Sequence, residues 1–176
     1  GAAPVNHCIL NGEIDTGVST IQMQRNIDTG DILMQQQYKL NDSINTGEVL
    51  QDLSYIGADL LLNTINSIEK NKITPKKQDE RLITYAPKIN ASDCKINWNN
   101  PAYQIHNQIR AFSPKPGAYT FINDVRMKLY KSQISKIKSG IVLDPGEIYL
   151  NNSNLYIGTG TDPIQIFEIQ REGKNK

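Results

Sequence analysis

The apolar and polar residues of this chain follow two different periods. Residues 16–23 and 31–38 alternate with a period of two, which predicts two β-strands joined by a loop. In residues 46–71 apolar residues recur every three or four positions, which predicts a long amphipathic helix with Thr46 as its N-cap. We expect the apolar stripe of this helix to lie in the core. The stripe consists of Val49, Leu50, Leu53, Ile56, Gly57, Leu60, Leu61, Ile65 and Ile68.

Two further helices and a set of short strands complete the predicted elements. Pro4 suits the first turn of a helix over 4–11, and Asn100 is the predicted cap of a helix over 100–112 with Pro101 at its first position. Turn residues then separate several short alternating segments, an arrangement typical of a small β-barrel. The predicted strands are 118–122, 125–132, 146–150, 154–158 and 164–170.

The stretch between the long helix and the second group of elements is polar, charged and interrupted by proline. We therefore divide the chain into residues 1–72, a linker over 73–90, and a second unit over 91–176. A chain of 176 residues can hold one large or two small domains.

The loop between the first two strands carries the most informative short sequence, Asn-Ile-Asp-Thr-Gly-Asp at 26–31. Gly30 gives this loop a backbone freedom that other residues lack, so the loop can fix Asp28 at its tip. We interpret Asp31 as a residue that stabilises the turn. Spacing alone leaves open whether Asp28 is a functional carboxylate or part of an ordinary Asx-turn.

Charge is distributed unevenly along the chain. Residues 1–72 contain four basic and nine acidic residues, a net charge of −5, whereas residues 73–176 contain fifteen and nine, a net charge of +6. Such asymmetry indicates a polyanionic partner for the second half, although a solvated basic surface would look the same. The cations predicted to contact phosphates are Lys76, Lys77, Lys88, Arg110, Lys115, Arg126, Lys128 and Lys131, followed by Lys136 and Lys138.

One predicted strand presents its cations on a single face. Arg126 and Lys128 are two residues apart and therefore project from the same side, which Tyr130 would continue as a surface for stacking. Trp98 is a second possible stacking residue, but we favour its burial against the helix over 100–112.

Composition argues against several other classes of protein. No apolar run approaches the roughly 20 residues that span a bilayer, so a membrane protein is not expected. Cys8 and Cys94 lie far apart, and His7 and His106 are isolated, so we expect neither a metal site nor a disulfide framework. This cysteine usage fits a reducing compartment.

Several short sequences, in order along the chain, resemble methionyl-tRNA formyltransferases. They are Gly-Ala-Ala-Pro at 1–4, Gly-Glu-Ile-Asp-Thr-Gly-Val-Ser at 12–19, Ile-Asp-Thr-Gly-Asp at 27–31, Gln-Asp-Glu at 78–80, Thr-Tyr-Ala-Pro-Lys-Ile at 84–89, Ile-Asn-Trp at 96–98 and Ile-Arg-Ala-Phe-Ser-Pro-Lys-Pro-Gly-Ala at 109–118. The resemblance implies an α/β fold: the C-terminal portion of a Rossmann-like formyltransferase domain, followed by an OB-like β-barrel. It also implies transfer of a formyl group from 10-formyltetrahydrofolate to the amino group of initiator methionyl-tRNA.

The resemblance also assigns roles to residues of this chain. Asp28 corresponds to the catalytic aspartate, and Asn26, Ile27 and Thr29 are the predicted folate contacts. Lys88 lies where the linker of the family approaches the acceptor end of the tRNA. We further expect no metal, no membrane association, a monomer, and a location in the bacterial cytoplasm or an organellar matrix.

We expect the sequence to be a fragment of such an enzyme. It starts at Gly1, without an initiator methionine and inside a family motif, while the Asn and His that support the aspartate in the family would precede it. The family also continues past Lys176, so this chain alone should have no appreciable transferase activity. The alternatives are a formyltransferase of sugar nucleotides, a formyl-folate hydrolase, and a stand-alone RNA-binding remnant.

Overall fold

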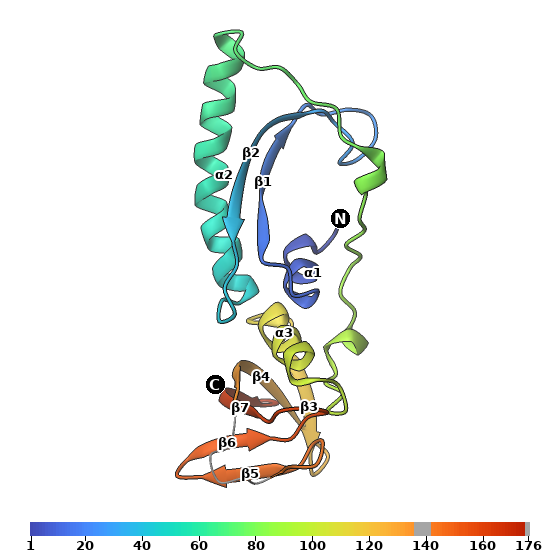
Figure 1. Cartoon of the computed structure of the whole chain (residues 1–176), viewed down its shortest axis with the longest axis vertical. Helices are drawn as coiled ribbons and strands as arrows, with labels where there is room; N and C mark the ends of the chain where they lie inside the picture. Colours follow the sequence, from blue (N-terminus) through green and yellow to red (C-terminus); the bar gives the residue numbers. More distant parts are fainter. Residues whose placement is uncertain (136–141, 175–176) are drawn as a thin grey trace.

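The computed structural model describes residues 1–135 and 142–174 and shows a mixed α/β molecule (Figure 1). The helices and strands in chain order are α1 (Pro4–Leu10), β1 (Asp15–Ile21), β2 (Ile32–Lys39), α2 (Thr46–Glu69), α3 (Ala102–Phe112), β3 (Ala118–Ile122), β4 (Val125–Ile134), β5 (Ile148–Asn151), β6 (Asn154–Ile157) and β7 (Ile164–Arg171). Two short 3₁₀ helices, η1 (Glu80–Leu82) and η2 (Ala91–Cys94), lie between α2 and α3.

The first part of the chain is an antiparallel hairpin of β1 and β2, with α2 beside it (Figure 1). Polar contacts as well as packing join the hairpin to α2. The hydroxyls of Thr20 and Thr64 lie 2.9 Å apart, and the Tyr38 hydroxyl donates to Asp52. The two strands and the long helix predicted from periodicity are confirmed.

The N-cap of α2 is Asn45, so the prediction of Thr46 was wrong by one residue. The Asn45 side chain accepts from the backbone N–H of Glu48, and the Glu48 carboxylate accepts from the backbone N–H of Asn45. This reciprocal capping box satisfies two N–H groups at once. The hydroxyl of Thr46 is free to donate instead to the carbonyl of Ala111, at 2.7 Å, which ties α2 to α3.

The apolar stripe of α2 is only partly in the core. Val49 and Leu60 are buried, whereas Leu50, Leu61, Ile65 and Ile68 are exposed. The expectation of a fully buried stripe was therefore wrong for these four residues. A two-stranded hairpin is narrow, and among the described residues it covers only one side of a helix of 24 residues.

The second part of the chain is a five-stranded antiparallel sheet in the order β3-β4-β7-β6-β5, with α3 packed against it. All five predicted strands are confirmed, with shifts of a few residues at their ends. No ladder between the edge strands β3 and β5 occurs in the described part of the chain, and the OB-like barrel remains a prediction. The helix α3 starts one residue later than predicted, since Pro101 occupies its N-cap and Ala102 N donates to the Thr161 hydroxyl.

A single hydrophobic core passes through both parts. Val5, Ile9 and Val49 from the first part belong to the same buried cluster as Ile105 and Phe112 of α3. The helix α3 therefore serves both halves: one side faces α1 and α2, and the other faces the sheet (Figure 1). Burial at this junction fixes the two parts against each other.

The predicted linker over 73–90 is an ordered strap along the first part (Figure 1). Lys76 pairs with Ile32 through two backbone hydrogen bonds of 2.8 Å, and the Ala86 carbonyl accepts from Ala2 N at 2.7 Å. These contacts bring the strap close to the loop that carries Asp28.

No helix of the described residues combines the length and apolar content that crossing a bilayer requires.

Candidate functional site

Asp28 lies at the tip of the loop between β1 and β2. Its backbone adopts φ 59°, in the left-handed region that aspartate and asparagine tolerate better than most other residues. The side chain is 66% exposed, and Oδ2 accepts a hydrogen bond from the nitrogen of Gly1 at 2.9 Å. The carboxylate is therefore within reach of an N–H donor.

Gly30 closes the turn for a reason other than a positive φ. It is buried, and a Cβ at this position would lie 1.9 Å from the carbonyl oxygen of Gln22. Next to it, the Gln22 N–H donates to the carbonyl of Asp31 at 2.9 Å. Close approach of two backbone segments thus requires glycine here, and Asp31 closes the turn through its main chain.

A side chain from the strap braces the Asp28 turn. Nε2 of Gln78 donates to the carbonyl oxygen of Asp28 at 2.9 Å and to that of Gly30 at 2.7 Å. The backbone pairing of Lys76 with Ile32 anchors the strap two residues earlier. Sequence reasoning gave Gln78 no role, because its two acceptors are 48 and 50 residues away in the chain.

Replacing Gln78 with leucine should loosen the turn without unfolding the chain. Two hydrogen bonds worth about 0.5–1.5 kcal/mol each are lost, so amide exchange at Ile32 and Lys76 should accelerate about 5- to 150-fold. Native-state hydrogen exchange measures this rate. The matched control is Gln35→Leu, which removes a side-chain hydrogen bond to Ser19 on the hairpin. Unchanged exchange in Gln78→Leu would mean that the brace does not hold the turn.

The three predicted folate contacts surround Asp28 on the same loop. The side chain of Ile27 is 89% exposed, and the Thr29 hydroxyl donates to the carbonyl of Asn26 at 3.1 Å. The apolar side chain of Ile27 and the hydroxyl oxygen of Thr29 are thus available to a flat ring with polar edges, such as that of a folate. Contact with folate stays a prediction for Asn26, Ile27 and Thr29.

Most of the predicted phosphate-contacting cations lie at the surface. The exposed ones are Lys76, Lys77, Lys88, Lys115 and Lys131. Arg126 and Lys128 are half-buried on β4, and the Lys128 ammonium donates to the carbonyl of Pro116 at 2.9 Å. Lys136 and Lys138 lie outside the described residues. The exposed lysines are distributed over the strap, the end of α3 and the sheet.

Arg110 is a buried structural residue, and we remove it from the phosphate-contacting set. It is only 6% exposed, and its guanidinium donates to Asn107 Oδ1 and to the carbonyls of Asn41 and Ile44, at 3.0, 3.0 and 3.4 Å. Burial lowers the pKa of this guanidinium. The loop before α2 packs over this end of α3 and so removes Arg110 from solvent.

Tyr130 does not continue the basic face of β4. The register shifts between Leu129 and Lys131, and this bulge places Leu129 and Tyr130 both in the interior. The Tyr130 hydroxyl donates to Gln170 at 2.7 Å, so the predicted stacking role was wrong. Trp98 is half-buried against the core and donates from its indole nitrogen to the Thr120 hydroxyl at 3.0 Å.

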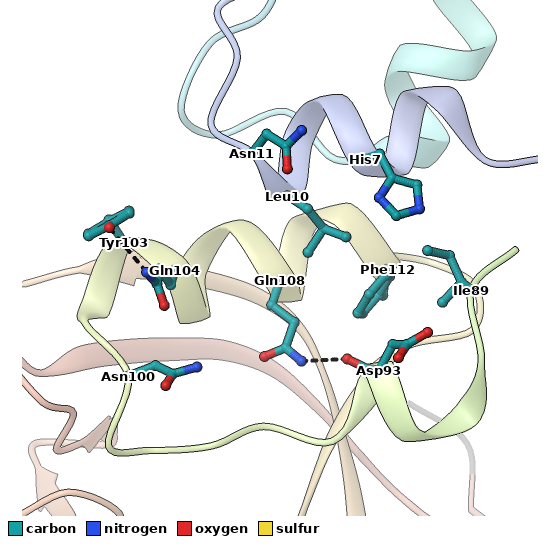
Figure 2. A pocket seen from close by; sticks show the side chains of 10 residues that line it. All are labelled: His7, Leu10, Asn11, Ile89, Asp93, Asn100, Tyr103, Gln104, Gln108 and Phe112. Atoms are coloured by element: carbon teal, nitrogen blue, oxygen red, sulfur yellow. Dashed lines mark hydrogen bonds between the residues drawn. The ribbon is translucent and has the colours of Figure 1, made fainter. Parts of the chain in front are cut away.

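A groove of about 470 Å³ lies between α1, α3 and the strap (Figure 2). Its walls carry the amides of Asn11, Asn100 and Gln104, and a dashed line in Figure 2 marks the bond from Gln108 to the carbonyl of Asp93. Among the described residues, no lysine or arginine lines this groove, and no residue of the Asp28 turn borders it. It is therefore unsuited to phosphate.

The cysteines and histidines have structural surroundings. Burial raises the pKa of the thiols of Cys8 and Cys94, which disfavours the reactive thiolate. His106 joins α3 to its neighbours, since its ring nitrogens lie 2.9 Å from the Ser132 hydroxyl and 2.6 Å from the Asp42 carbonyl. Burial lowers the pKa of this imidazole. No group of three potential metal-binding side chains occurs within residues 1–135 and 142–174.

Comparison with known proteins relates this geometry to a group of enzymes. Residues 88–176 match the family described as "Formyl transferase, C-terminal domain". The chain is 38% identical over 178 residues to the methionyl-tRNA formyltransferase of Syntrophomonas wolfei, and 40% identical over 174 residues to that of Thermodesulfovibrio yellowstonii. The matches cover 100% and 99% of this chain but 56% and 55% of those proteins, so the chain spans about half the length of these relatives.

Solved structures of similar shape include a formyltransferase crystallised with a sugar nucleotide. The N-formyltransferase from Helicobacter canadensis, crystallised with folinic acid and dTDP-3-aminofucose, superposes with a TM-score of 0.75 at 25% identity. The superposition covers 97% of this chain and 61% of that structure.

Proposed function

From the premise that this chain belongs to the formyl transferase C-terminal domain family, we propose that it forms about half of a methionyl-tRNA formyltransferase. In this proposal residues 1–72 complete the catalytic domain, the strap over 73–90 connects the parts, and residues 91–176 form a tRNA-binding, OB-like unit. The proposal rests on the exposed carboxylate of Asp28, whose turn is held by a hydrogen bond from Gln78 of the strap.

Asp28 supplies the proton acceptor in this reaction. The amino group of the methionyl residue attacks the formyl carbon of 10-formyltetrahydrofolate, a C–N bond forms, and an oxyanion develops. The attacking nitrogen loses a proton to the Asp28 carboxylate, directly or through water, and the bond to the folate nitrogen breaks as that nitrogen regains a proton. A positioned carboxylate contributes about 10²–10⁴-fold to such a step. Hydrogen-bond donors must also face the developing oxyanion.

The folate donor is expected beside the same turn. A folate-type ligand is bound in the Helicobacter canadensis enzyme, which supports this class of formyl donor. We place the contacts at Asn26, Ile27 and Thr29, where Ile27 offers apolar surface and Thr29 offers its hydroxyl oxygen. In this proposal the rest of the folate pocket lies in the part of the enzyme that this chain does not cover.

A polyanionic acceptor is favoured over a sugar nucleotide by charge. The net charge of +6 in residues 73–176 and the exposed lysines of strap and sheet suit a long phosphate backbone. The alternative acceptor, a sugar nucleotide, is supported only by the similar shape of the Helicobacter canadensis N-formyltransferase. The bacterial relatives favour a cytoplasmic location, and we continue to propose a monomer.

Binding of initiator methionyl-tRNA to this chain should weaken steeply with salt. Each lysine that neutralises a phosphate adds about 0.7–0.9 to the slope of log K against log salt concentration, so Lys115→Gln and Lys131→Gln should each reduce it by that amount. Filter binding at several salt concentrations measures the slope. The matched control is Lys39→Gln, an exposed lysine on β2 in the acidic half. Equal slopes for all three variants and the parent would contradict the proposed RNA surface.

A further inference from the structure

We propose that the outer side of the β3–β4 hairpin is a platform on which unpaired RNA bases stack. This aromatic–cationic face consists of Lys95, Tyr119, Phe121, Arg126 and Lys128. The inference rests on the proposed function, since it names the way in which the basic half holds single-stranded segments of its RNA. Phosphate contacts alone do not require aromatic rings at the surface.

Strand register brings these five side chains to one side of the sheet. In β3 the residues Ala118 and Thr120 are buried, so Tyr119 and Phe121 project from the opposite face. Phe121 lies opposite Arg126 in β4, and Tyr119 opposite Lys128. Residues paired in this way share a face.

Lys95 extends the same face beyond the edge of the sheet. Its backbone forms a parallel bridge with Tyr119, and its exposed ammonium lies 5.9 Å from the centre of the Phe121 ring. A cation at this distance from a ring attracts it and also stands ready for a phosphate next to a stacked base.

The rings of Tyr119 and Phe121 are held by their neighbours, while Phe121 remains half exposed to solvent. Tyr119 and Phe121 meet edge to face, with centroids 5.8 Å apart at 88°. The Arg126 guanidinium covers the ring of Tyr119 at 3.8 Å, whereas Phe121 is 51% exposed. Phe121 therefore offers exposed ring surface on which a planar group could stack.

The cations of this face are only weakly neutralised by the protein. Arg126 meets the carboxylate of Glu172 at 3.8 Å, and this carboxylate is itself 64% exposed, so the ion pair is weak. Lys128 donates to a neutral carbonyl. Three positive charges around two rings suit a ligand that combines anionic and flat apolar groups, and single-stranded nucleic acid has both.

The test compares single-stranded with paired RNA on the whole chain. Fluorescence anisotropy would follow a labelled 12-nucleotide RNA of mixed sequence and the same strand annealed to its complement. Phe121→Leu should weaken binding of the single strand about 5- to 100-fold and leave the duplex and the salt slope unchanged. Phe121→Trp should restore binding, and Lys95→Gln should lower the salt slope by about 0.7.

The matched control is Phe167→Leu on β7, since Phe167 is also 51% exposed but lies outside this face. It should bind both RNAs as the parent does. Equal binding of the single strand by the parent and Phe121→Leu would overturn the platform, as would no binding by the parent at low salt. If initiator tRNA still bound with its full salt slope in either case, the proposed function would stand without the platform. If the parent bound neither the single strand nor initiator tRNA, both proposals would be overturned.

Discussion

Replacing Asp28 with asparagine should lower kcat by about 10²–10⁴-fold in a full-length formyltransferase that carries this sequence. Asparagine tolerates the left-handed backbone at this position, so the turn keeps its shape while the proton acceptor is lost. The side chain is largely exposed, which leaves stability close to that of the parent. Single-turnover formylation of methionyl-tRNA measures the chemical step directly.

Asp31→Asn is the matched control for this prediction. It removes a carboxylate three residues away whose contribution to the turn comes from its backbone carbonyl. The rate should stay within a few-fold of the parent. Similar losses in both variants would mean that the loop needs its negative charge in general, and the special role of Asp28 would fall.

Arg110→Met should lower the free energy of unfolding by about 2–4 kcal/mol and leave the salt dependence of RNA binding unchanged. Methionine keeps an apolar stem of similar length but removes the donors to Asn107, Asn41 and Ile44. Because these bonds join α3 to the loop before α2, the first and second parts should unfold together at lower denaturant concentration. Urea unfolding followed by circular dichroism measures the change.

Lys115→Gln, three residues beyond the end of α3, is the contrasting variant. It should keep the stability of the parent and reduce the salt slope. If Arg110→Met instead reduced the slope at unchanged stability, Arg110 would be a surface cation and its burial in the structure would be contradicted.

Periodicity in the sequence predicted most of the secondary structure because each element has one face against the core. The strands around Asp28 and the helix α3 are clear examples, since Ile105 and Ile109 of α3 lie four positions apart and are both fully buried. The strand over residues 118–122 contained a further signal. Tyr119 and Phe121 alternate with buried residues, a pattern from which their common outer face could have been predicted.

Features that depend on distant parts of the chain were missed or misassigned. The bonds from Gln78 to the Asp28 turn and the burial of Arg110 under the loop before α2 both join residues far apart in sequence. Tyr130 was assigned to the wrong face of β4, because a bulge turns its side chain to the other face and leaves no signal in the sequence. The exposed side of α2 shows the limit of periodicity, which predicts an apolar face but not what covers it.

Formyl transfer to competing acceptors shows whether the Asp28 carboxylate serves an RNA-borne amine. A full-length enzyme with this sequence would be given labelled 10-formyltetrahydrofolate together with initiator methionyl-tRNA and dTDP-3-aminofucose. We expect the label on the tRNA, at a rate that falls by at least about a hundredfold in Asp28→Asn. Label on the sugar, or equal rates for the parent and the variant, would contradict it.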